Sequence, residues 1–170
     1  IRRQRQMCIR DRTTPAHQLA LAAVYYSPLQ YMYWYDKPSD SQDEPELKFF
    51  DDVYTTWDDT KVLQGEVGEF ITIARRKGEE WFIGSITNNE KRVLSVSLDF
   101  LPEGKNYIAE IYTDGDKSVK TRTKVRVSTY RVSNKTKLNF CLKASGGGAV
   151  RLVPDDGNIK SVKNYKQQRL

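Results

Sequence analysis

Short runs of alternating apolar and polar residues dominate the chain from residue 69 onward. Alternation with a period of two predicts strands that bury one face, and Gly, Asn, Asp and Pro between the runs predict turns. Seven such runs within about 85 residues are typical of an antiparallel β-sandwich. The predicted strands are 69–76, 80–87, 92–98, 106–113, 124–132, 137–142 and 149–153.

The first part of the chain has a different pattern, which predicts a helix over residues 15–27. Thr14 can cap it, Pro15 suits its first position, and Pro28 ends it. Leu19, Ala20, Ala23 and Val24 form one apolar stripe, and Leu21 and Tyr25 widen it. A helix that is apolar over so much of its girth is expected to lie between a sheet and a neighbouring helix. Left exposed, such a face would indicate a missing partner.

An aromatic segment and an acidic segment follow the helix. Residues 29–35 predict a short buried strand. The acidic residues of 39–46 suggest either a hard-cation site or a solvated loop, and we favour the loop because the spacing does not match an EF-hand. A further helix is expected near residues 46–54.

The net charge of +6 is concentrated at the two ends of the chain. Residues 1–12 hold five Arg and one Asp, and residues 159–170 hold four basic residues and no acidic one, which leaves a charge of −2 on 13–158. An acidic body with basic ends gives little support to a nucleic-acid groove, so we expect no nucleic-acid partner. Residues 155–170 are predicted to form a basic, flexible tail.

Few residues could carry catalysis or hold a metal. His17 is the only histidine, and we expect it to pack or to form hydrogen bonds. Cys141 is predicted to be a small buried residue of a strand. Asp58 and Asp59 are adjacent, so their side chains are expected to point apart and to shape the chain rather than act as a catalytic pair. No run reaches the roughly 18 apolar residues of a membrane span, and we expect no membrane partner.

Three phrases carry a resemblance to a known family: TPAHQLALAAVYYSPLQ, TTWDDTKVLQGEVGEF and ITIARRKGEEWFIGSIT. Over roughly residues 13–153 the chain resembles the C-terminal part of glycoside hydrolase family 97. The resemblance implies the end of a (β/α)8 barrel over 13–62, with its last strand and flanking helices, and a β-sandwich over 63–154. In the family the catalytic carboxylates precede this region, so these residues alone are expected to be inactive.

The same resemblance implies partners and a cofactor for a full-length parent. That parent would hydrolyse α-glycosidic bonds of oligosaccharides as an α-glucosidase or α-galactosidase, would hold calcium, and would be periplasmic or secreted. No cofactor is expected within this chain, and its partners would be the catalytic barrel and, through it, the oligosaccharide substrate.

The loop after the last barrel strand holds the residues predicted to bind substrate. In a (β/α)8 barrel the strand ends surround the active site, which would place Trp34, Tyr35 and Asp36 at its rim. An aromatic ring there can stack on a sugar and a carboxylate can accept from its hydroxyls. The alternative, which we favour, is that the two aromatic residues belong to the core and Asp36 starts a turn.

Two further expectations concern the chain as a whole. Residues 1–12 resemble translated sequencing-adapter read-through and are predicted to be foreign to the protein. The competing function is a standalone carbohydrate-binding or adhesion module. It would need an exposed platform among Trp81, Tyr107, Tyr112 and Tyr130, for which core packing is the simpler expectation.

Overall fold

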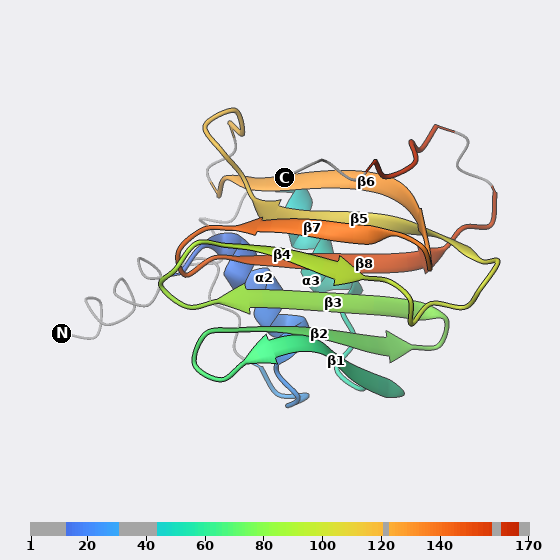
Figure 1. Cartoon of the computed structure of the whole chain (residues 1–170), viewed down its shortest axis with the longest axis horizontal. Helices are drawn as coiled ribbons and strands as arrows, with labels where there is room; N and C mark the ends of the chain where they lie inside the picture. The colour runs from blue at the N-terminus through green and yellow to red at the C-terminus, as the bar shows by residue number, and fades with distance from the viewer. Residues whose placement is uncertain (1–12, 31–43, 121–122, 158–160, 167–170) are drawn as a thin grey trace.

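The computed structural model describes residues 13–30, 44–120, 123–157 and 161–166, and shows two antiparallel sheets with a helical layer (Figure 1). The larger sheet has six strands in the order β1-β2-β3-β8-β5-β6, and β4 pairs with β7 in a separate two-stranded sheet. The strands are β1 Asp59–Glu66, β2 Phe70–Lys77, β3 Glu80–Thr87, β4 Arg92–Ser97, β5 Asn106–Asp114, β6 Val125–Ser133, β7 Lys137–Leu142 and β8 Gly147–Pro154. The predicted antiparallel sandwich is therefore confirmed.

Strand β1 is the element that the hydrophobic pattern did not predict. It pairs with β2 from Asp59 to Glu66, with a register shift between Val62 and Gln64. None of its residues is fully buried. Because an edge strand of this kind is held mainly by backbone hydrogen bonds to its neighbour, its sequence does not need the alternation that marks a half-buried strand.

The main hydrophobic core lies between the two sheets. The two-stranded sheet of β4 and β7, here called the β4–β7 sheet, contributes Leu94, Val96, Leu138, Phe140 and Leu142, which pack against the inner face of the six-stranded sheet. Burial alternates along β7, so that Cys141 points outward and is exposed. The prediction of a buried Cys141 is wrong because the strand covers the core with its even-numbered residues only.

The helical layer covers the opposite face of the six-stranded sheet (Figure 1). It consists of α2 Pro15–Val24, the 3₁₀ turn η2 Pro45–Leu47 and the short helix α3 Lys48–Asp52. With the β4–β7 sheet on one face and helices on the other, β2, β3 and β8 are buried on both faces. Apolar residues can therefore occupy both sides of these strands, as Trp81, Phe82 and Ile83 do in β3.

Helix α2 begins as predicted and ends earlier than predicted. The Thr14 side chain accepts a hydrogen bond from the His17 amide, and Pro15 occupies the first turn. The helix ends at Val24 rather than at residue 27, because the backbone turns extended at Tyr25. Leu19, Ala20 and Ala23 are fully buried, so the apolar stripe is covered by this chain's own sheet and does not require a missing partner.

The barrel strand predicted at 29–35 falls largely on residues 31–43, which lie outside the described residues. Leu29 and Gln30 are not in a strand. Between residues 13 and 62, the described part of the chain contains α2, η2, α3 and the start of β1.

Two glycines allow α2 to approach the sheet closely. A Cβ at Gly84 of β3 would lie 2.4 Å from the Ala20 carbonyl oxygen, and one at Gly147 of β8 would lie 2.5 Å from the His17 Cα. Both opposing groups are backbone atoms, which cannot move aside as a flexible side chain can. The helix can therefore rest on β3 and β8 because its backbone at Ala20 and His17 faces glycines there.

We predict that Gly84→Ala destabilises the chain by about 3 kcal/mol, because the added methyl group forces α2 away from β3. Chemical denaturation followed by circular dichroism measures the change. Gly65→Ala is the matched control, since its new Cβ would lie 3.3 Å from its nearest neighbours. Equal losses for the two variants would contradict close packing at Gly84 as the cause.

Candidate functional site

A buried arginine of the sheet closes the C-terminal end of α2. Arg75 of β2 is 1 % exposed. Its Nε donates to the Ala23 carbonyl at 2.5 Å and its Nη2 to the Val24 carbonyl at 3.0 Å, while Nη1 donates to Thr60 Oγ1 at 3.1 Å. Helix C-termini leave carbonyls unpaired and carry partial negative charge, so a cation at this point is favourable. Burial lowers the pKa of Arg75, yet an arginine remains charged.

Aromatic rings surround this guanidinium. Its central carbon lies 5.4 Å from the Tyr26 ring centre and 6.0 Å from that of Trp57, both within cation–π range. Trp57 and Tyr54 both contact Phe82 of β3, with ring centres 5.4 and 5.7 Å away. The end of α2 is thus joined to the chain just before β1.

The outer side of this cluster is exposed. Tyr26 is 81 % exposed, and Tyr25, Leu29 and Tyr54 are also exposed; we call these four residues the aromatic patch. Gln30 folds the chain back on the helix end through hydrogen bonds to the Ala22 and Ser27 carbonyls. Large exposed apolar side chains gathered in one place commonly mark an interaction surface.

A second arginine attaches α3 to the sheet. Arg151 of β8 pairs with Asp52 at 2.7 Å and with Glu80 at 2.9 Å. Burial alone would lower the pKa of Arg151, but the hydrogen bond and charge of Glu80, followed by the charges of Asp52 and Glu110, raise it. Phe49 of α3 inserts beside Phe82 and Tyr112. A helix of five residues has no stability of its own, so these contacts hold it in place.

The carboxylates examined as candidate catalysts have structural partners instead. Asp58 accepts hydrogen bonds from the Gly78 amide and the Lys77 ammonium, and the first of these lowers its pKa. Asp59 accepts from the Thr60 amide. Asp58 therefore holds the turn between β2 and β3, whereas Asp59 lies at the start of β1, so the adjacent pair has structural roles, as predicted.

Two other predictions for individual side chains have opposite outcomes. His17 Nδ1 lies 3.1 Å from the Gly146 carbonyl oxygen, which confirms a hydrogen-bonding role, and burial lowers its pKa. Glu44 and Glu46 were predicted to be solvated, but both are buried, and Glu46 accepts from the Thr123 hydroxyl. The predicted loop is wrong at these two positions because η2 turns them toward the sheet.

The predicted rim residues Trp34, Tyr35 and Asp36 lie outside the described residues, as do Asp40 and Asp43. Within the described ranges, no group of three or more His, Cys, Asp and Glu residues could hold a metal ion. No helix in the described part of the chain is long and apolar enough to cross a membrane.

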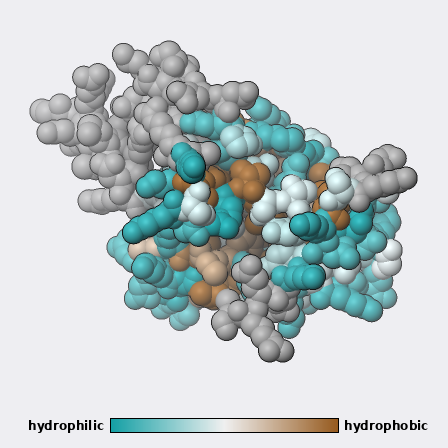
Figure 2. All heavy atoms as spheres, turned by 90° about the horizontal axis from the view of Figure 1, so that it is seen from above, coloured by the Kyte–Doolittle hydropathy of each residue, from teal (hydrophilic) through white to brown (hydrophobic). Residues whose placement is uncertain are grey.

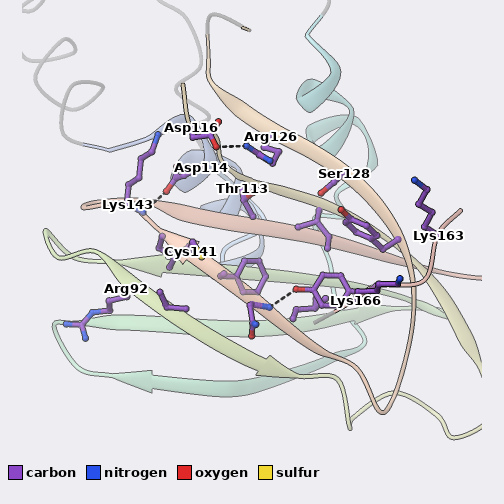
Figure 3. A pocket seen from close by; sticks show the side chains of 18 of the residues that line it. Arg92, Thr113, Asp114, Asp116, Arg126, Ser128, Cys141, Lys143, Lys163 and Lys166 are labelled. Carbon is purple, nitrogen blue, oxygen red and sulfur yellow. Dashed lines mark hydrogen bonds and ion pairs between the residues drawn. The ribbon is translucent and has the colours of Figure 1, made fainter. Parts of the chain in front are cut away.

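A groove of about 1210 Å³ lies on the other side of the molecule, between β6 and the β4–β7 sheet (Figure 3). Seen from the β6 side, hydrophobic residues gather around a central hollow that hydrophilic residues surround (Figure 2). Residues 162–166 form part of one wall. Although 155–170 was predicted to be a flexible tail, the Arg131 amide donates to the Lys163 carbonyl and the Tyr165 amide donates to the Arg131 carbonyl, each at 2.9 Å.

Arg75, Arg151 and the groove were not predicted from the sequence. The one available signal was the presence of arginines within strands that otherwise read as apolar and buried, since a buried charge requires partners. The partners lie 15 to 99 residues away along the chain, and no local pattern could identify them.

Comparison with known proteins agrees with this architecture. Residues 56–153 match the family described as glycosyl-hydrolase 97 C-terminal, oligomerisation. The chain is 34 % identical over 140 residues to a retaining alpha-galactosidase of Bacteroides thetaiotaomicron, an alignment that covers 82 % of this chain and 21 % of the relative. The chain belongs to glycoside hydrolase family 97, as its C-terminal domain.

Solved structures give the same result. A family 97 enzyme from Pseudoalteromonas sp. strain K8, in complex with acarbose, superposes with a TM-score of 0.75 at 37 % identity, covering 84 % of this chain and 23 % of that one. A beta-arabinopyranosidase superposes with a TM-score of 0.66 at 25 % identity, covering 82 % and 21 %. The chain thus spans about a fifth of the length of these relatives.

We predict that Arg75→Met destabilises the chain by about 3 kcal/mol, because the end of α2 loses its buried donors. Urea denaturation followed by Trp fluorescence is a suitable measurement. Arg76→Met is the control: Arg76 donates to the Gly78 carbonyl in an exposed turn, and its loss is expected to cost less than about 1 kcal/mol. Arg75→Lys should fall between the two, since it keeps the charge without the planar fork. Similar losses for both Met variants would show that Arg75 does not hold the helix.

Proposed function

We propose that this chain acts as the C-terminal part of a family 97 glycoside hydrolase that cleaves α-glycosidic bonds of oligosaccharides. In this proposal, residues 13–62 complete the catalytic barrel, the sandwich supports it, and the catalytic carboxylates come from preceding sequence. The relatives support the reaction class: one is named as a retaining alpha-galactosidase, and family 97 enzymes of Pseudoalteromonas sp. strain K8 were solved with acarbose and with panose.

The observation that carries the proposal is the aromatic patch on the outer side of the helical layer. Arg75 and Arg151 fix this layer to the sheet, so α2 and α3 move with the sandwich as one body. The patch remains exposed at the end of α2, immediately before the segment predicted to enter the barrel. Tyr25, Tyr26, Leu29 and Tyr54 would be buried by that barrel, which is the partner we assign to them.

The competing standalone module receives less support. Trp81, Tyr107 and Tyr112 are 4 %, 2 % and 1 % exposed, and they belong to the core as expected. Tyr130 is half-buried against Tyr165. Because none of these four rings is exposed, they do not form the aromatic platform that a standalone carbohydrate-binding module would need.

The proposal predicts that this domain can replace its counterpart in a relative. Residues 13–153 would be joined to the retaining alpha-galactosidase in place of that enzyme's own C-terminal region. We expect the chimera to hydrolyse α-galactosides within about tenfold of the parent rate, since the catalytic groups are unchanged.

Three controls make the chimera decisive. The relative truncated before this region should lose stability and activity, and the chimera with Tyr26→Ser and Tyr54→Ser should have a lower Tm than the unchanged chimera. The isolated chain should not hydrolyse the substrate. Hydrolysis by the isolated chain, or a truncated enzyme as stable and active as the chimera, would refute the proposal.

We further propose that Trp34, Tyr35 and Asp36 lie at the rim of the active site and contact the sugar. Replacing Trp34 and Asp36 by Ala in the active chimera is expected to raise KM at least about threefold, because a stacking contact and a hydrogen bond are lost. The Tm measured on the same variants separates a lost contact from misfolding. Unchanged kinetics with unchanged stability would instead place these residues away from the substrate.

A further inference from the structure

Basic residues from distant parts of the chain line the groove between β6 and the β4–β7 sheet. Seven basic and two acidic residues line it, a formal charge of +5, whereas residues 13–158 together carry −2. The basic residues are Lys91, Arg92, Arg126, Arg131, Lys143, Lys163 and Lys166. Such a concentration in a concave surface attracts an anionic ligand.

Only the arginines of this set are neutralised by neighbouring carboxylates. Arg92 pairs with Glu69 at 2.6 Å, Arg126 with Asp116 at 2.8 Å, and Arg131 with Asp155 at 2.5 Å. The four lysines form no ion pair with any carboxylate in the described ranges. Lys143 Nζ donates to the Gly115 carbonyl, which leaves its charge uncompensated.

The lysines lie at separate places along the groove. Lys143 stands at one end, near Asp114 and Asp116, and Lys163 and Lys166 stand at the other, with Ser128 between them (Figure 3). The spacing suits an extended ligand with several negative charges better than a single small anion.

The groove also offers hydrogen-bond acceptors, which narrows the class of ligand. Asp114 and Ser128 line it together with the lysines. Sugar hydroxyls need acceptors as well as donors, whereas a phosphodiester backbone presents acceptors only.

The aromatic residues of the groove argue against a nucleic acid. Tyr130 and Tyr165 pack edge to face with ring centres 5.4 Å apart, and the Tyr165 hydroxyl accepts from the Asn139 amide at 3.1 Å. This contact covers one face of one of the two rings, which leaves less aromatic surface on which bases could stack. They join β6 to β7 and so shape the groove.

From this arrangement we propose that the groove binds an acidic saccharide, a chain of sugars that carries carboxylate or sulfate groups. Lys143, Lys163 and Lys166 pair with the anionic groups, and the Asp114 and Ser128 side chains contact the hydroxyls. This site lies on the opposite side of the six-stranded sheet from the aromatic patch and does not depend on the proposed function.

The test measures binding of the purified chain to polygalacturonate at low ionic strength by affinity electrophoresis, with neutral amylose and single-stranded DNA as comparison ligands. We expect polygalacturonate to be bound, and the triple variant Lys143→Gln, Lys163→Gln, Lys166→Gln to bind roughly tenfold or more weakly. Heparin compared with polygalacturonate distinguishes sulfate from carboxylate as the preferred group.

The matched control removes three lysines outside the groove, Lys61→Gln, Lys77→Gln and Lys105→Gln, and so has the same net charge as the triple variant. It should retain binding. Ser128→Trp, which fills the groove without changing charge, should lose binding, and circular dichroism verifies that each variant is folded.

Four results would overturn the proposal. One is an equal loss of binding in the control variant, which would indicate diffuse charge. Another is retained binding in Ser128→Trp. The third is tighter binding of DNA than of polygalacturonate, which would identify a nucleic-acid site; absence of any binding at low ionic strength would likewise exclude the acidic saccharide.

Discussion

The position of the helical layer depends on one buried charge, the guanidinium of Arg75. A desolvated cation is unfavourable unless its hydrogen bonds are satisfied, and here two helix carbonyls and a threonine hydroxyl satisfy them. The same contacts supply the donors that the C-terminal end of α2 lacks, since no basic residue lies in its last turn. Helix α2, β2 and the start of β1 are therefore mutually dependent. Without one another, the donors of Arg75 and the carbonyls at the end of α2 would lack hydrogen-bond partners.

The six-stranded sheet separates two surfaces of different character. On one face, the backbone of α2 at Ala20 and His17 meets Gly84 and Gly147, and ion pairs of Arg151 fix α3, so the aromatic patch projects from a rigid support. On the other, the two-stranded β4–β7 sheet covers only part of the larger sheet, which leaves the groove beside β6. In the function we propose, the first surface contacts the barrel and the second remains open to a separate ligand.

The strands that were predicted correctly are those in which burial either alternates or is continuous along the strand. Both patterns can be recognised from neighbouring residues in the sequence. β1 was missed because an exposed edge strand needs neither pattern. The boundary of α2 was placed at Pro28, the strongest local signal, whereas the helix ends at Val24, where its last carbonyls reach Arg75. Cys141 and Glu46 were misjudged for a related reason: which side of a strand or turn faces the core is decided by elements distant in the sequence.

By itself, the sequence determined the antiparallel sandwich, the capped apolar helix before it and membership of glycoside hydrolase family 97, since periodicity, capping residues and characteristic phrases are all short-range properties. Only the tertiary structure decided how charge is distributed in space. The lysines of the groove come from both an acidic body and a basic end, and the arginines that hold the helical layer find partners dozens of residues away. Coulomb interactions and hydrogen bonds depend on distance in the folded molecule, and chain order does not reveal that distance.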